Sequence, residues 1–194
     1  WRSPHFGWSR TQGIGQDVRY GKHEGIAFPR FGMVGETSFF TNSCFVSGII
    51  QMAVTISLYN HTAKRFASGE NASGDTYKLK LYASTTFDAA VTTLASVSGE
   101  EATAGTGYTA GGQALTNVTV TVETTNDAKF DADDVVWTAS GGPITAGFGV
   151  LYNDTDANDP PVAFINFDGS QSAGDGTDFK VVWNANGIFT FTVT

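Results

Sequence analysis

The sequence has few cysteines, histidines and charged residues, and each shortage excludes a class of site or protein. A single cysteine, Cys44, among 194 residues cannot form an internal disulfide framework, and it is expected to pack as a small apolar side chain. Three histidines and one cysteine lack the spacing of a zinc site. Only 15% of residues are charged while 41% are hydrophobic, which is the composition of a folded chain rather than a disordered one.

Basic residues are also few, and long apolar runs are missing. Nineteen Asp and Glu outnumber eleven Lys and Arg, which gives a net charge of −8. Nucleic acid is not expected as the main partner, because phosphate groups need a basic face, and a membrane surface is disfavoured for the same reason. No run approaches the roughly 18 apolar residues of a membrane-spanning helix.

Residues 1–51 differ from the rest of the chain in charge and in pattern. Residues 1–50 hold five basic and three acidic residues, so they carry +2 and the remainder carries −10. Glycine or proline recurs every few positions, and no period of 2 or 3.6 is sustained. We expect an irregular segment rich in aromatic residues and glycine, followed by one domain over residues 52–194.

Two interpretations of residues 1–51 stay open. The segment is either an extended arm whose aromatic side chains contact neighbouring proteins, or an extension that is foreign to the natural protein. The second interpretation rests on Met52, which precedes the run Ala-Val-Thr-Ile-Ser-Leu-Tyr-Asn and resembles a fresh start. The chain also opens at Trp1 rather than at methionine.

The domain after this segment opens with a helical pattern. Apolar residues from Ile56 to Phe66 follow near-helical spacing, and Gly69 comes soon afterwards as a stop signal. We predict one short amphipathic helix over residues 56–67. His61 is expected on its polar, solvated face.

Strand patterns dominate the rest of the domain. In residues 76–83, Tyr77, Leu79 and Leu81 alternate with polar or outward residues, as in a strand with one solvated face. Residues 114–123 alternate as well, with a one-residue slip near Asn117 that predicts a β-bulge. Further strands are expected at residues 129–131, 135–138, 145–152, 162–167, 179–183 and 188–193.

Clusters of glycine, aspartate and asparagine separate these segments, at residues 141–143, 153–161, 168–178 and 184–187. Short strands with such turns between them indicate an antiparallel β-sandwich, either jelly-roll-like or immunoglobulin-like. The sequence therefore predicts a mostly β fold with the single helix near its start. The core is expected to contain seven large aromatic residues: Trp137, Phe148, Phe164, Phe167, Phe179, Trp183 and Phe189.

The sequence offers little for catalysis or cofactor binding. It has no Gly-x-Ser-x-Gly elbow and no glycine-rich phosphate loop with a following lysine. His61 is the one histidine after residue 51. We predict no catalytic residues and no cofactor, and a protein that is not an enzyme.

Acidic residues gather in two places, at residues 131–134 and 153–159. In the second place Asp154, Asp156, Asn158 and Asp159 offer oxygen ligands at nearly alternate positions, as a calcium loop does. The glycine and the final glutamate of an EF-hand are missing, and Asp and Asn favour turns for local reasons. A solvated loop is the favoured interpretation, and a calcium site is the alternative.

Residues 105–112 read Gly-Thr-Gly-Tyr-Thr-Ala-Gly-Gly. Glycine tolerates unusual backbone angles and close approach, so this stretch is a candidate contact loop. An ordinary long turn between two strands is the alternative. The candidate contact residues are Gly105, Gly107, Tyr108, Gly111 and Gly112.

Six stretches in this order resemble a family of structural proteins of tailed bacteriophages. They are residues 52–60, 75–84, 105–112, 130–140, 146–155 and 165–193, so the resemblance covers about residues 52–194. Each stretch alone is weakly specific, and their order and spacing carry the resemblance. The family supplies no catalytic or binding residues that transfer to this chain.

The resemblance implies a non-enzymatic protein of the virion, assembled in the bacterial cytoplasm. Its implied partners are the major capsid protein or other virion proteins, and a homo-oligomer is expected, with a trimer as the first choice. Capsid decoration, as a cement protein, is the leading expectation. A tail, neck or fibre-anchor component is the first alternative, and a carbohydrate-binding β-sandwich module is the second.

Overall fold

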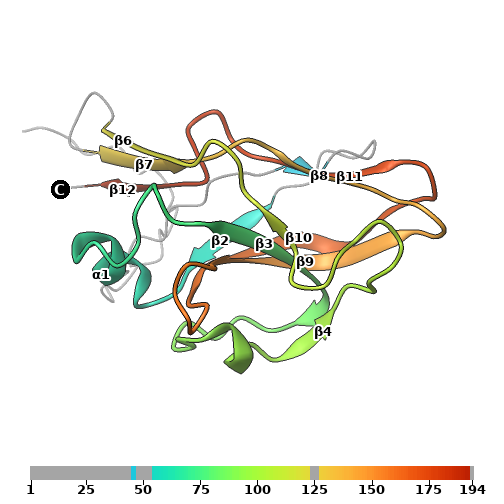
Figure 1. The fold of residues 1–194 in the computed structure, drawn as a ribbon, viewed down its shortest axis with the longest axis horizontal. Helices are drawn as coiled ribbons and strands as arrows, with labels where there is room; N and C mark the ends of the chain where they lie inside the picture. The colour runs from blue at the N-terminus through green and yellow to red at the C-terminus, as the bar shows by residue number, and fades with distance from the viewer. Residues whose placement is uncertain (1–44, 47–53, 123–126, 193–194) are drawn as a thin grey trace, which may run out of the picture. The chain divides into compact units, whose positions relative to one another are not determined.

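The structure is a computed structural model that describes residues 45–46, 54–122 and 127–192. One layer is a six-stranded sheet in which neighbouring strands are antiparallel (Figure 1). Its order is β2 (Thr55–Leu58), β10 (Pro161–Ala173), β9 (Ile144–Asn153), β3 (Tyr77–Thr85) and β4 (Gly99–Glu101), with β5 (Gln113–Ala114) also paired to β3. A 3₁₀ helix, η1 (Leu94–Ser96), precedes β4.

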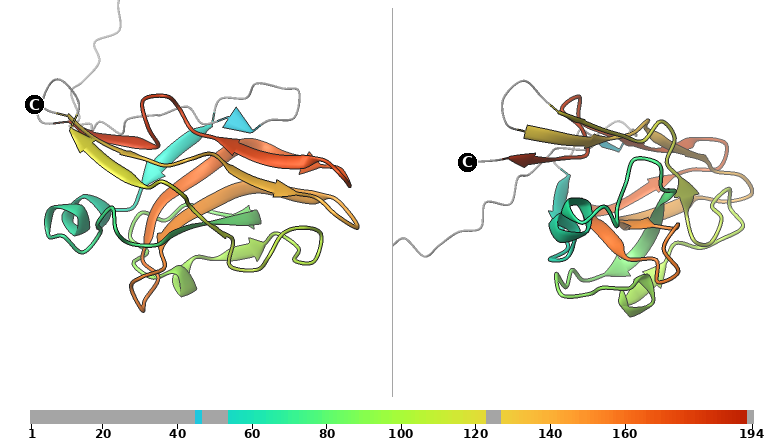
Figure 2. Two further views of the ribbon diagram at one scale, coloured as in Figure 1. Left: turned by 45° about the horizontal axis from the view of Figure 1, so that its top comes forward. Right: turned by 60° about the vertical axis from the view of Figure 1, so that its left-hand side comes forward.

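Two three-stranded sheets form the facing layer (Figure 2). One has the order β1 (Phe45–Val46), β11 (Asp178–Val182) and β8 (Val135–Thr138). The other has the order β12 (Phe189–Thr192), β7 (Asp127–Asp131) and β6 (Thr119–Val122). The chain between β7 and β8 and between β11 and β12 links the two sheets, so together they cover one face of the six-stranded sheet.

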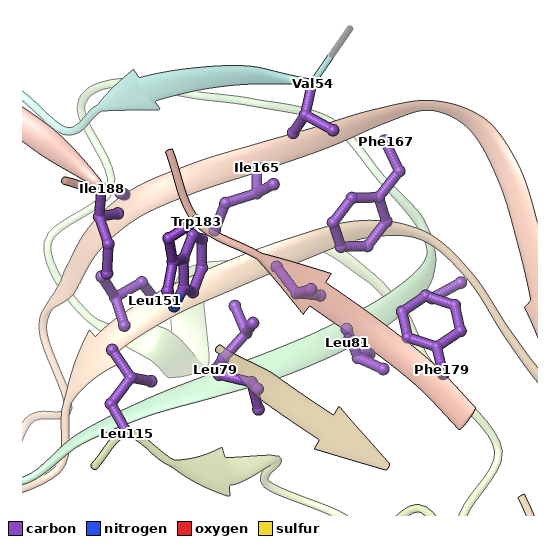
Figure 3. Close-up of a cluster of buried hydrophobic side chains, with 14 of the residues drawn as sticks. Val54, Leu79, Leu81, Leu115, Leu151, Ile165, Phe167, Phe179, Trp183 and Ile188 are labelled. Carbon is purple, nitrogen blue, oxygen red and sulfur yellow. The ribbon is translucent and has the colours of Figure 1, made fainter. Parts of the chain in front are cut away.

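The main core lies between these layers. Leu79, Leu81, Leu151 and Ile165 of the six-stranded sheet face Phe179 of β11 across it, all at 1% exposure or less (Figure 3). The alternation predicted for residues 76–83 is the reason, because it aims Tyr77, Leu79 and Leu81 at one face. The predicted mostly β, antiparallel sandwich is confirmed.

A second apolar cluster lies around Tyr59, Tyr82, Val150 and Phe164, with Phe148 partly buried beside it. Phe148 and Phe164 therefore belong to this smaller cluster rather than to the main core. The other five aromatic residues predicted for the core lie in the main core.

The helix predicted over residues 56–67 is half wrong. α1 spans Thr62–Ala67, and the residues before it form β2, in which Ile56 pairs with Ile165 of β10. The β-branched residues of β2 are better placed in a sheet than in a helix. Thr62 starts the helix and donates a hydrogen bond to the Val162 carbonyl at 2.7 Å, which ties α1 to β10.

The bulge predicted near Asn117 is also wrong. Asn117 has a positive φ of 53°, and the chain there leaves β5, which pairs with β3, to enter β6, which pairs with β7. The slip in the apolar pattern thus marks a crossing between layers. The loop predicted at residues 168–178 is strand up to Ala173, with an irregularity against β9 where Asp168 and Gly169 have positive φ.

β1 lies inside the segment expected to be an arm, and it pairs with β11. The remaining predictions for residues 1–51 fall outside the described residues, as does the boundary at residue 52. Among the described helices, none has the length and apolar character to cross a membrane.

Candidate interaction surfaces

The glycine-rich loop at residues 105–112 contacts a carboxylate, that of Glu101. Glu101, the last residue of β4, accepts hydrogen bonds from the Tyr108 hydroxyl at 2.9 Å and from the Gly111 N–H at 2.5 Å. It also forms an ion pair with Lys80 at 2.9 Å. Burial opposes the charge of Glu101, but Lys80 and these two donors outweigh it and hold the pKa of the carboxyl below its usual value.

Tyr108 is the anchor of the loop rather than a contact residue on its surface. Its side chain is 2% exposed, its ring lies near Trp137, and its hydroxyl accepts a hydrogen bond from the Leu81 N–H at 3.1 Å. Burial raises the pKa of Tyr108 far above its usual value, so the hydroxyl stays protonated. The buried tyrosine was not foreseen by the interpretation of this stretch as a contact loop.

The glycines of the loop serve close approach, as their sequence suggested. A Cβ on Gly107 would lie 2.0 Å from the Thr138 carbonyl oxygen, and one on Gly112 would lie 2.0 Å from that of Leu79. The carbonyl of Gly111 accepts a hydrogen bond from the Tyr152 hydroxyl at 2.9 Å. Gly105 faces open space. The loop is a fixed turn between β4 and β5, and a contact role for its exposed rim stays a prediction.

The four candidate calcium ligands lie together in the turn between β9 and β10, but other groups engage them. Asp154 pairs with Lys78 at 2.9 Å, and Asp156 pairs with Arg65 at 2.7 Å. The backbone N–H of Asn158 also bonds Asp156, and that bond, with Arg65, holds the pKa of Asp156 below its usual value.

Asp159 has a positive φ of 45° and donates its backbone N–H to the Asp156 carbonyl at 2.8 Å, closing the turn. Across the described part of the chain, no three His, Cys, Asp or Glu side chains gather as metal ligands. The turn interpretation accounts for these residues, and the structure adds nothing for the calcium alternative.

The second acidic cluster also has structural partners. Asp134 accepts a hydrogen bond from the backbone N–H of Trp183 at 3.0 Å, and it forms an ion pair with Lys180 at 2.9 Å. Asp133 accepts bonds from the side chains of Thr116 and Asn117. These contacts fix the connection between β7 and β8 against its neighbours.

A buried polar network lies beside α1, and no sequence pattern signalled it. Asn153 is 1% exposed and donates to the side chains of Asn71 at 3.0 Å and Asp75 at 2.9 Å. Arg65 donates to Asn71 at 3.2 Å and reaches Asp156. These contacts connect α1 to the loop after it and to the turn between β9 and β10. Only the folded topology brings these segments together.

An apolar groove of about 450 Å³ lies between α1 and the sheet β12–β7–β6. The helix contributes Ala63, Phe66 and Ala67, the sheet contributes Val120, Ala128 and Phe191, and residues 71–73 also line the groove. None of these lining residues carries a charge. Exposed apolar patches of this kind often mark interaction sites.

One of the strands that line the groove, β6, is exposed. All four residues of β6 are exposed, with Val120 at 41% and Val122 at 85%. Among the described residues, one other large hydrophobic side chain is exposed, Phe87 at 36%. Phe87 packs against Tyr59 and Phe164, so it covers the second apolar cluster.

His61 is not the solvated residue expected from the sequence. Both ring nitrogens are shielded from solvent and make no well-formed hydrogen bond to the described residues, and the ring lies near that of Tyr59. Burial lowers the pKa of His61 below its ordinary value of 6.5, and it outweighs the nearby Pro161 carbonyl, which favours the proton. The folded protein therefore holds a neutral imidazole.

We predict that this histidine makes the fold less stable in mild acid. Its contribution is complete above the unfolded pKa of about 6.5 and is lost as pH falls toward the lower folded pKa, because the unfolded chain then binds the proton more readily. His61→Gln cannot titrate, so its free energy of unfolding should fall less between pH 7.5 and pH 5.5 than that of the wild type. Urea unfolding at both pH values measures this. Equal losses in the two proteins would contradict a folded-state pKa of His61 that lies below its ordinary value.

Comparisons with protein families, with curated proteins and with solved structures find no match to this chain.

Proposed function

We propose that this chain is a non-enzymatic structural protein of a bacteriophage particle, and that it decorates the capsid as a cement protein. The observation that carries the proposal is an uncharged groove lined in part by the exposed Val120 of β6, on a chain with a net negative charge. Such a surface suits contact with another folded protein. The six stretches that resemble phage structural proteins direct the choice of partner.

The body around this surface is suited to a lattice. The two layers enclose an extensive core, and Glu101 and Asp134 accept hydrogen bonds that join loops to this body. A cement protein needs such a rigid body, because it resists forces between capsomers. The partners proposed are the major capsid protein or other virion proteins, with assembly in the bacterial cytoplasm. A tail, neck or fibre-anchor position is the alternative within the same particle.

A binding experiment separates the two positions. Particles assembled without this protein are divided into capsids and tails, and the purified chain is added to each before sedimentation. Decoration predicts saturable binding to expanded capsids, at hundreds of copies each, because the lattice repeats the site. Val122→Lys should weaken that binding if β6 contacts the capsid.

Binding to tails alone would replace decoration by the tail alternative. Binding to neither would contradict both positions and would favour the carbohydrate-binding alternative. Sugar-dependent protection against thermal unfolding tests that alternative, since a bound ligand stabilises only the folded state.

A further inference from the structure

Residues 86–98, which we call the strap, join β3 to β4 and lie over the second apolar cluster (Figure 1). Phe87 packs its ring against those of Tyr59 and Phe164, with ring centroids 5.2 Å and 5.3 Å apart. Beneath the strap, the buried members of the cluster are 5% exposed or less. Three further apolar side chains of the strap pack against them: Val91, Leu94 and Val97.

The strap is held to the body by few contacts. None of residues 86–98 is itself buried. Among the described residues, two backbone hydrogen bonds join its middle to the body. The Asn60 N–H donates to the Ala89 carbonyl at 2.9 Å, and the Leu94 N–H donates to the carbonyl of Asp159 at 3.0 Å. Segments with few buried contacts are the first to open locally in a native protein.

Both of these bonds lie beside His61. Asn60 immediately precedes it, and Asp159 lies two positions before Pro161, whose carbonyl is close to the imidazole. The Tyr59 ring, which the strap contacts, stacks near the imidazole with ring centroids 6.2 Å apart. A movement of the imidazole therefore reaches the strap through two backbone bonds and one aromatic contact.

The surroundings of His61 do not favour a charged imidazole. Both ring nitrogens are shielded from solvent and make no well-formed hydrogen bond to the described residues. Arg65 of α1 opposes a proton there, while Glu70 of the following loop and the nearby carbonyl of β10 favour it. Asp88, the one charged residue of the strap, is close enough to act on the Tyr59 hydroxyl. A charge buried without a partner is unfavourable, so a protonated ring needs access to water.

We propose that the strap is a pH-sensitive cover, closed while His61 is neutral and released when His61 binds a proton. Release breaks the two backbone bonds, withdraws Phe87 from the cluster and lets water reach the imidazole. The rest of the sandwich stays folded, because the main core lies on the other face of the sheet. Val150 and Leu151 are adjacent in β9 and point to opposite faces, the first into the second cluster and the other into the main core.

Mild acid favours the released form. Burial lowers the pKa of His61 in the closed form below its ordinary value of 6.5, and release lets the imidazole return toward that value. The closed form is therefore fully favoured above about pH 6.5, and its advantage is lost as pH falls toward the lower pKa of the closed form. As the pH falls, the apolar outer face of the sheet becomes accessible more often.

Thiol labelling of the full chain distinguishes release of the strap from global unfolding. Val150→Cys places a thiol beneath the strap, and Leu151→Cys places one in the main core, each with the native cysteine replaced by Cys44→Ser. Both positions are 0% exposed and adjacent in one strand, so the pair is matched. A pyridyl disulfide reagent labels each native variant. Each rate is divided by the rate of the same variant unfolded in urea at the same pH.

Val150→Cys should be labelled about tenfold faster than Leu151→Cys or more, because release of the strap is easier than global unfolding. Its rate should rise by about threefold or more from pH 7.5 to pH 5.5, since release takes up a proton. Equal rates for the two variants at both pH values would overturn the proposal. A Val150→Cys rate that does not change with pH would overturn it as well.

His61→Gln, added to Val150→Cys, tests whether this histidine controls the strap. Glutamine cannot titrate, so the rise in labelling between pH 7.5 and pH 5.5 should disappear. His61→Phe, which places an apolar ring beside Tyr59, gives the same test if the glutamine variant does not fold. A rise that persists in either folded variant would contradict control by His61.

Phe87→Ala, added to Val150→Cys, tests the cover itself. It removes the aromatic contacts of the strap, so the labelling rate at pH 7.5 should rise by about threefold or more. An unchanged rate would show that the strap does not control access to Val150. The proposal is independent of the proposed function, because it concerns the free chain.

Discussion

Replacing Gly112 by alanine is expected to lower the free energy of unfolding by about 4 kcal/mol, because two costs add. Gly112 has a φ of +86°, where a side chain is strained, and its Cβ would lie 2.0 Å from the carbonyl oxygen of Leu79. That oxygen belongs to the central part of β3 and cannot move without disturbing the sheet. Urea unfolding followed by tryptophan fluorescence measures the loss.

Gly105 provides the matched control within the same loop. Its φ of +96° is similar, but a Cβ there meets nothing within 4 Å. Gly105→Ala should therefore show the backbone strain alone, about 1–2 kcal/mol. A loss for Gly112→Ala no larger than that for Gly105→Ala would show that the loop does not lie against β3 as described.

Replacing Glu101 by alanine is expected to cost about 2–3 kcal/mol at pH 7. The change leaves Lys80, the Tyr108 hydroxyl and the Gly111 N–H without the carboxylate that they share. Glu101 and Lys80 keep 25% and 18% of their side-chain surface, so water offsets part of the loss. Glu100, the preceding residue, is exposed, and Glu100→Ala should change stability by less than about 0.5 kcal/mol.

The pH dependence gives a second check on Glu101. Its folded pKa lies below the ordinary value of 4.5, so its contribution is complete above about pH 4.5 and is lost as pH falls through the folded pKa. The difference between wild type and Glu101→Gln should be largest near neutrality and shrink below pH 4.5. A difference that does not depend on pH would contradict an ionised Glu101 that binds Lys80, Tyr108 and Gly111.

Strands whose alternation is unbroken could be predicted from the sequence with nearly correct bounds. β8 (Val135–Thr138) matches its predicted range, and β3 (Tyr77–Thr85) differs by one residue at its start and two at its end. In these strands, local pattern and burial agree, because one face of each strand packs into the core. The β-sandwich follows from many such strands separated by turn residues.

The errors arise where a local pattern has two solutions. The spacing from Ile56 to Phe66 fits a helix, but pairing of Ile56 with β10 favours a strand, and that pairing depends on residues more than a hundred positions away. A β-bulge and a crossing between layers would produce the same one-residue slip in the apolar pattern near Asn117. Sequence pattern cannot distinguish these without the partner strands.

The candidate surfaces were predicted only in part. The glycines of residues 105–112 signalled close approach, and two of them make it. The contacts of Glu101 with Lys80 and Tyr108 were not predicted, because the three residues come from separate segments. The groove and the exposed β6 edge depend on which strand ends the sheet, and the alternating run at residues 114–123 resembles an ordinary half-buried strand.

Quantitative mass spectrometry of purified particles of the source phage tests the central claim most directly. The proposed decoration role predicts hundreds of copies of this chain per particle, in a fixed ratio to the major capsid protein. A count in the tens would instead support the tail or neck position. Absence of the chain from the particles would contradict the proposal that it is a structural protein of the virion.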